Sequence, residues 1–241
     1  MGKRMLGGLL LVVCLLGLGG CVFGSVDEMY ALPKSSEAYV NLQAKINEEK
    51  GTGEYIAPLN GENRQTIQLV DVDEDGLQEA VAFFRDADAD TPLRIVIFKQ
   101  DDQGEYQVYA RIQGVGSEID SIEYVDLGGA GESDVLVSWQ AGSSLRTLVG
   151  YTITDGQPTE IMRSAYDRYL TADLDGDGQE EVVLAQAEEE SSTRIEYYDS
   201  RDGVLTLTAT SPLSDGTTDI SSWSAGWLEE TVPALFVTSY F

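Results

Sequence analysis

The segment 67–83 reads IQLVDVDEDGLQEAVAF, and the segment 169–184 reads YLTADLDGDGQEEVVL. Each consists of an apolar run, a nine-residue acidic stretch that contains Asp-Gly, and a second apolar run. Short apolar runs separated by Asp-Gly turns predict antiparallel β-hairpins. A third segment, 122–137, has the same layout with IEYVDLGGAGESDVLV, where glycine and alanine replace the middle acids. The sequence therefore contains three related units.

These units recur at the spacing of propeller blades. Their first aspartates, Asp71, Asp126 and Asp173, are 55 and 47 residues apart. Units of four strands and about 40 to 50 residues are typical of β-propeller blades. The other two strands of each unit are expected, joined by a tight turn, at 93–99 and 106–112, 146–154 and 159–164, and 194–199 and 204–210.

We therefore predict an all-β fold, an incomplete β-propeller of about three and a half four-stranded blades. The blades are expected at about 65–113, 119–165 and 167–211, with a partial blade at 218–241. Complete rings usually have about six to eight blades, and a shorter array leaves strand edges exposed. The pattern favours a fragment of a longer protein or a truncated gene model over closure by a second copy.

One short helix is expected before the first unit, within an N-terminal helix and connector at 36–64. It begins at a capping Ser36 and ends near Lys50. Its apolar stripe consists of Tyr39, Leu42 and Ile46. Gly51 and Gly53 follow the end of the helix. We expect this helix to pack against the first sheet; the alternative is a loosely ordered amphipathic stretch.

The N-terminus has the layout of an export signal. Residues 1–20 begin with positive charge at Lys3 and Arg4 and continue into an apolar run at 6–18, which is short for a membrane-spanning helix. The run ends in Leu-Gly-Gly-Cys21 and resembles the lipobox of bacterial lipoproteins. That resemblance implies a cleaved signal peptide at 1–20, a lipid on Cys21, a tether at 21–35 and an extracytoplasmic location on a bacterial membrane. An ordinary secretory signal or an uncleaved anchor helix are the alternatives.

Composition excludes several classes of function. The chain has 15 Lys and Arg against 42 Asp and Glu, a net charge of −27, so a nucleic acid is not an expected partner. It has no histidine, which removes the commonest general base and transition-metal ligand. Its two cysteines, Cys14 and Cys21, both lie in the N-terminal segment, so the repeats have no thiol nucleophile and no disulfide.

The acidic loops have the spacing of a calcium site. Carboxylates stand at positions one, three, five and nine of each loop, and a glycine at position six allows a sharp turn. Such spacing directs several oxygens to one point, which suits a hard cation such as Ca²⁺. The candidate ligands are Asp71, Asp73, Asp75, the Leu77 carbonyl and Glu79 in the first loop, and Asp173, Asp175, Asp177, the Gln179 carbonyl and Glu181 in the third. Solvated Asp-Gly turns are the alternative.

An EF-hand loop begins in the same way but needs a glutamate at position twelve and helices on both sides. Ala82 and Leu184 occupy that position here, between predicted strands. The loops instead resemble the FG-GAP or VCBS-type repeats of integrin-like β-propellers, over about residues 65–241, although both end on glutamate where that family more often has aspartate. The resemblance implies a structural calcium ion between the first two strands of a blade. The second loop, around Asp126 and Asp134, is expected to be empty.

The expected function is a membrane-anchored, non-catalytic module that binds a protein or glycan or serves as a scaffold, by analogy with the family. The alternative is an envelope carbohydrate-active enzyme, a hydrolase or lyase, that uses carboxylate pairs such as those among Glu188, Glu189 and Glu190. A solvated hairpin turn explains that acidic run equally well. A purely structural envelope subunit is a third possibility.

Overall fold

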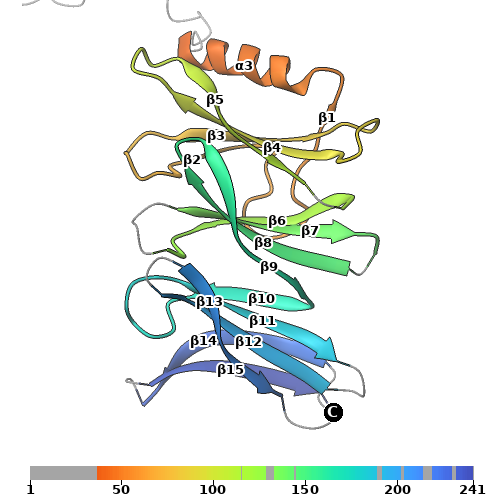
Figure 1. The fold of residues 1–241 in the computed structure, drawn as a ribbon, viewed down its shortest axis with the longest axis vertical. Coiled ribbons are helices and arrows are strands. Elements are labelled where there is room, and N and C mark those ends of the chain that lie inside the picture. Colours follow the sequence, from red (N-terminus) through yellow and green to blue (C-terminus); the bar gives the residue numbers. More distant parts are fainter. Residues whose placement is uncertain are drawn as a thin grey trace, which may run out of the picture. The chain divides into compact units, whose positions relative to one another are not determined.

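The computed structural model describes residues 37–114, 116–128, 133–143, 145–188, 192–201, 204–213, 219–229 and 232–240 (Figure 1). The expected signal peptide at 1–20, the Cys21 expected to carry a lipid, the expected tether at 21–35 and the predicted helix cap Ser36 lie outside these residues. Within the described ranges, no helix has the length and apolar character needed to cross a bilayer. All the strands belong to one unit, Ala38–Phe241.

The strands form four antiparallel sheets that follow one another along the chain (Figure 1). In the first sheet, β3 pairs with both β1 and β2 on one side and with β4 on the other. Its strands are β1 (Glu54–Tyr55), β2 (Ile67–Val70), β3 (Glu79–Arg85), β4 (Leu93–Gln100) and β5 (Tyr106–Gln113). The short strand β1 has no counterpart in the sequence-based expectation.

The next two sheets have four strands each, in simple sequence order. The second sheet contains β6 (Glu118–Val125), β7 (Asp134–Ala141), β8 (Leu145–Thr154) and β9 (Gln157–Tyr166). The third contains β10 (Arg168–Ala172), β11 (Glu181–Glu188), β12 (Ser192–Arg201) and β13 (Val204–Pro212), and the fourth pairs β14 (Asp219–Leu228) with β15 (Val232–Tyr240). The all-β expectation is confirmed, and the second pair of strands in each of the first three sheets lies where the sequence predicted it.

The sheets bury both of their faces, which explains the nearly continuous apolar runs in their central strands. On β3, Ala80, Ala82 and Phe84 point to one side and Val81 and Phe83 to the other, because side chains alternate along a strand. The first set packs against the helix, and the second packs against the second sheet. A further cluster joins the second sheet to the third.

The expected helix is present as α3 (Glu37–Lys50) and covers the outer face of the first sheet. Its buried residues are Leu42 and Ile46, as predicted, but Tyr39 is 53% exposed. The apolar stripe instead begins at Ala38, which is partly buried and lies four residues before Leu42. Glu49 accepts two hydrogen bonds from the Arg111 guanidinium, at 2.6 and 2.9 Å, and so ties the end of the helix to β5.

Neighbouring sheets are also linked by backbone hydrogen bonds beside the acidic loops. The amide of Ser133 donates to the Val72 carbonyl at 2.8 Å, and the amide of Glu180 donates to the Asp126 carbonyl at 3.0 Å. Ser133 and Glu180 each precede the second strand of their sheet. Each loop is therefore held to the loop of the next sheet, so a change in one loop bears directly on its neighbour.

Candidate metal centres

The two predicted acidic loops join neighbouring antiparallel strands. The loop 71–79 connects β2 to β3, and the loop 173–181 connects β10 to β11. Ala82 and Leu184, at loop position twelve, lie within strands and are fully buried. Because strands flank both loops, the structure excludes EF-hands here, as the sequence indicated.

The same hydrogen bond from a backbone amide to an aspartate side chain shapes both loops. Asp71 Oδ2 accepts the Gly76 amide at 3.0 Å, and Asp173 Oδ2 accepts the Gly178 amide at 3.2 Å. Gly76 and Gly178 have φ angles of 87° and 91°, in the region that side-chain-bearing residues avoid. The first aspartate and the glycine at position six therefore shape the turn together.

The last acid of each loop also has a structural role. Val72 donates its amide to Glu79 Oε2 at 2.8 Å, and Leu174 donates to Glu181 Oε2 at 2.6 Å. Both glutamates are 1% exposed. One oxygen of each closing acid thus satisfies a buried amide. The other oxygen of Glu79 has no hydrogen-bond partner among the described residues, whereas Glu181 is also hydrogen-bonded by the Tyr197 side chain.

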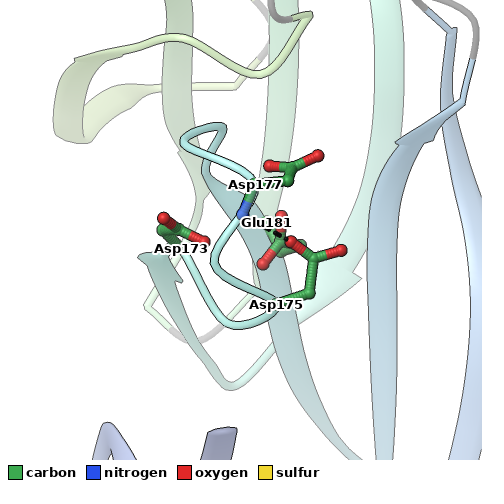
Figure 2. Close-up of side chains that lie close together, drawn as sticks. All are labelled: Asp173, Asp175, Asp177 and Glu181. Carbon is green, nitrogen blue, oxygen red and sulfur yellow. Dashed lines mark hydrogen bonds between the residues drawn. The ribbon is translucent and has the colours of Figure 1, made fainter.

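The third loop brings four carboxylates together. One oxygen each from Asp173, Asp175, Asp177 and Glu181 lies within 4.8 Å of the others (Figure 2). The three aspartates are exposed and Glu181 is buried beneath them. Among the described residues, no lysine or arginine forms a salt bridge with any of the four. All four acids that the sequence predicted as ligands of this loop converge.

The crowding of these acids changes the proton affinity of the buried one. Burial raises the pKa of Glu181 to about 7; the Leu174 hydrogen bond opposes the rise, and the negative charge of Asp175 adds to it. A carboxylate held in such a site is stabilised by a nearby cation. The oxygen donors and the charge of this loop therefore fit a hard divalent ion such as Ca²⁺.

In the first loop three acids converge, not four. Asp71, Asp73 and Glu79 each place one oxygen within 4.8 Å of the others. Asp71 Oδ1, Asp73 Oδ1 and Glu79 Oε1 are buried and have no hydrogen-bond partner among the described residues. Burial raises the pKa of Glu79, the Val72 hydrogen bond opposes the rise, and the Asp73 charge adds to it. Orphaned acceptor oxygens at one point also fit a cation.

A lysine from β4 lies against the first loop. The Lys99 ammonium forms ion pairs with Asp73 and with Asp75, the latter at 3.0 Å. Burial opposes the charged form, yet the hydrogen bonds to Asp73 and Asp75 raise the pKa of Lys99. Asp75 pairs with Lys99 and lies outside the cluster, whereas the sequence predicted it as a ligand. The first loop is thus partly neutralised from within.

The residue at the Lys99 position differs in each sheet. Lys99 follows Phe98, whose cross-strand partner is Ala80, the residue after the closing Glu79. In the second sheet, the residue after the closing Asp134 pairs with Tyr151, which Thr152 follows. In the third sheet, the residue after Glu181 pairs with Tyr198, which Asp199 follows. The equivalent strand position is therefore occupied by a lysine, a threonine and an aspartate in the three sheets; Lys99 pairs with acids of the first loop and Thr152 is hydrogen-bonded to Asp134 of the second.

In the second loop the closing acid keeps its structural role. Asp134 accepts the Leu127 amide at 3.2 Å through Oδ2 and is hydrogen-bonded by the Thr152 hydroxyl through Oδ1. Residues 129–132, at the middle of this loop, lie outside the described residues. The expectation that this loop holds no ion stays a prediction.

The position-seven residues, Leu77 and Gln179, are placed alike. Their amides donate to Asp75 Oδ1 and Asp177 Oδ1, each at 2.8 Å. The Leu77 side chain is exposed, and the Gln179 side-chain amide donates to Asp177 Oδ2 at 2.9 Å. The role of the two carbonyls as ligands stays a prediction. Of the acidic run considered for catalysis, Glu188 ends β11, and Glu189 and Glu190 lie outside the described residues.

Lys99 and Asp199 were not identified from the sequence. Each lies on the third strand of its sheet, and Lys99 is 26 residues from Asp73. The connection from β3 to β4 is not a tight turn, so the register that places Lys99 opposite Glu79 cannot be counted along the chain. Alternation within 93–100 predicts which residues share a face with Lys99, but it does not predict that Lys99 lies beside the loop.

The chain was compared with protein-family models and with curated proteins. No family model matches it. No curated protein matches it either.

Proposed function

We propose that this chain is a calcium-stabilised, non-catalytic binding or scaffold module built as an incomplete β-propeller of FG-GAP/VCBS-type repeats. The observation that carries the proposal is the convergence of Asp173, Asp175, Asp177 and Glu181, with no paired lysine or arginine among the described residues. The successive antiparallel sheets are packed face to face, and related loops join β2 to β3, β6 to β7 and β10 to β11; both features support the propeller. The third loop is the principal calcium site.

The role of the ion in this proposal is structural. Four carboxylates within 4.8 Å repel one another, and a divalent ion removes that repulsion and holds β10 to β11. With a Kd of about 0.1 mM, typical of extracellular modules, about 1 mM calcium stabilises the fold by about 1.4 kcal/mol. That corresponds to a rise in Tm of about 3–6 °C for a domain of this size.

The test is a calcium titration of the full chain in detergent, by calorimetry and thermal unfolding, with and without chelator. Asp177→Asn removes one negative charge from the cluster but keeps an acceptor for the Gln179 amide. We expect it to weaken calcium binding at least about tenfold. Asp102→Asn, in the exposed turn between β4 and β5, is the matched control and should leave binding unchanged. Equal calcium responses in the two variants would contradict the proposal.

The location of the module is proposed from the sequence of the N-terminus. Cleavage before Cys21 and acylation of its sulfur would anchor the chain outside the cytoplasm, because two or more acyl chains give stable membrane attachment. Cys21→Ser should move the protein from the membrane fraction to the soluble fraction of a bacterial host, and intact-mass analysis should show the loss of the lipid. A Cys14→Ser variant that remained lipidated is the expected control.

A further inference from the structure

The third sheet also borders a cavity at the ends of its strands opposite the calcium loop. The cavity has a volume of about 550 Å³ and is lined from the second, third and fourth sheets. The pair Ala172 and Glu181 adjoins the acidic loop, whereas Arg168 and its partner Ala185 line the cavity. Four residues of strand separate the two places by about 13 Å. The cavity is therefore distinct from the metal centre.

The base of the cavity is fixed by buried hydrogen bonds. The Tyr166 hydroxyl is bonded to Ser138 and lies 3.4 Å from Asp120 Oδ2. Asn60 donates to the other oxygen of Asp120 at 2.8 Å. The Tyr169 ring meets the Tyr166 ring edge-on, with centroids 5.1 Å apart. Side chains held in this way are ordered before a ligand arrives, which lowers the entropy cost of binding.

Two guanidinium groups at the cavity have unused hydrogen-bond donors. Arg146 lies over the Tyr166 ring at 5.5 Å, and its closest carboxylate oxygen, on Asp120, is 3.8 Å away, beyond hydrogen-bond distance. Arg168 is exposed and pairs with no described residue. Acceptors are present as well, because Asp167 lines the cavity and has one oxygen bonded to the Ala187 amide at 2.6 Å. The lining thus offers both donors and acceptors.

The charges of the lining decide the class of ligand. Arg146 and Arg168 are balanced by Asp120 and Asp167, so the cavity favours neither an anion nor a cation. Hydroxyl groups both donate and accept hydrogen bonds, and Trp223 supplies flat apolar surface for a ring. We propose that this cavity binds a neutral sugar unit of a glycan. This inference rests on the proposed function because both treat the chain as a binding module, but sugar binding at the cavity does not require the calcium site.

The experiment measures the binding of neutral oligosaccharides to the full chain, held in a detergent without a sugar headgroup. Cellotetraose, maltotetraose and tri-N-acetylchitotriose serve as probes, and trigalacturonic acid serves as the charged comparison, with calorimetry and tryptophan fluorescence as readouts. We expect at least one neutral probe to bind with a millimolar dissociation constant and trigalacturonic acid to bind more weakly. No binding by any neutral probe, or tighter binding of trigalacturonic acid, would overturn the inference.

Two substitutions assign the binding to the cavity. Trp223→Ala and Arg168→Gln should each weaken binding at least about tenfold, because they remove a ring contact and charge-assisted hydrogen bonds. Trp227→Ala is the matched control, since Trp227 lies on the same strand, is exposed and does not line the cavity. Trp223→Phe should retain part of the binding, which separates a ring contact from a folding defect. Binding that survives Trp223→Ala in a folded protein would overturn the assignment.

Calcium and chelator arms keep this inference separate from the proposed metal site. Sugar binding without any calcium-dependent shift in Tm would overturn the calcium proposal and support the cavity. A calcium-dependent shift in Tm without sugar binding would support the calcium proposal and overturn the inference about the cavity.

Discussion

The loops 71–79 and 173–181 share the hydrogen bonds between their backbone amides and their acidic side chains but differ in the charges that surround them. In both, the first aspartate accepts the position-six amide and the closing glutamate accepts the position-two amide. Lys99 pairs with two acids of the first loop, whereas Asp199 occupies the equivalent position beside the third. The same turn is therefore paired with a lysine in the first sheet and has no paired lysine or arginine among the described residues in the third.

This difference shows that the acid spacing of a loop does not by itself set the charge that surrounds it. The nearest positive partner of Asp199 is Arg201, an exposed residue whose Nε lies 3.6 Å away. The first loop, in contrast, has an ammonium in direct contact with Asp73 and Asp75. We expect the third loop to dominate the calcium response and the first loop to contribute less.

The largest effect should come from transferring the lysine. Asp199→Lys changes the charge at the strand position equivalent to Lys99 by two units, and unit charges a few ångströms apart interact by about 1 kcal/mol even in water. We expect calcium affinity at this loop to fall about a hundredfold, measured by calorimetry. Asp199→Asn is the graded control and should cause a smaller loss. If both variants bind calcium like the parent, the strand position has no influence on the loop.

A smaller, opposite effect is expected at the first loop. Lys99→Met removes the internal cation, so the free energy of unfolding in chelator should fall by about 1 kcal/mol. Calcium affinity at this loop should rise about tenfold, because the ion no longer competes with an ammonium for Asp73. Thermal unfolding in chelator and in calcium measures both changes. Lys99→Arg, which keeps the charge, should leave the calcium response low; a high response in that variant would refute the charge argument.

A third effect concerns pH. The folded protein raises the pKa of Glu181 from 4.5 to about 7, so it binds this proton more tightly than the unfolded chain does. In chelator, the contribution of Glu181 to stability is therefore complete below about pH 4.5 and is lost as pH rises through about 7. Calcium binds the ionised carboxylate, so its affinity should increase over the same window.

Calorimetry at about pH 5.5, 6.5 and 7.5, in buffers of different ionisation enthalpy, counts the proton released on calcium binding. Glu181→Gln should abolish most of the pH dependence, since the amide does not titrate. Glu79→Gln is the paired variant in the first loop. A pH dependence that survives Glu181→Gln would assign the proton to another group.

Much of the architecture was predictable because its signals are local. Alternating apolar residues and Asp-Gly turns gave the outer strands of the first three sheets, and the position-six glycines marked turns that need positive φ. The helix was predicted, but its stripe begins at Ala38 and not at Tyr39, since only packing on β3 determines which face is buried.

The candidate site was predictable only in part. The acids of the third loop converge as their spacing suggested, because all four ligands lie within nine residues of one turn. The pairing of Asp75 with Lys99 was not predictable, because it depends on the register between β3 and β4 across a longer connection. The cavity beside Tyr166 combines residues from three sheets and has no sequence motif.

The sequence by itself determined the strands other than β1, the turns and the positions of the acidic loops, since these follow from backbone preferences and alternation within a few residues. Only the tertiary structure decided which charge faces each loop and how the arginines and aromatic rings gather at the opposite strand ends. Those features depend on strand register and sheet packing, where residues far apart in the chain come within a few ångströms. A one-residue shift in register would turn Lys99 or Asp199 to the other face of its sheet.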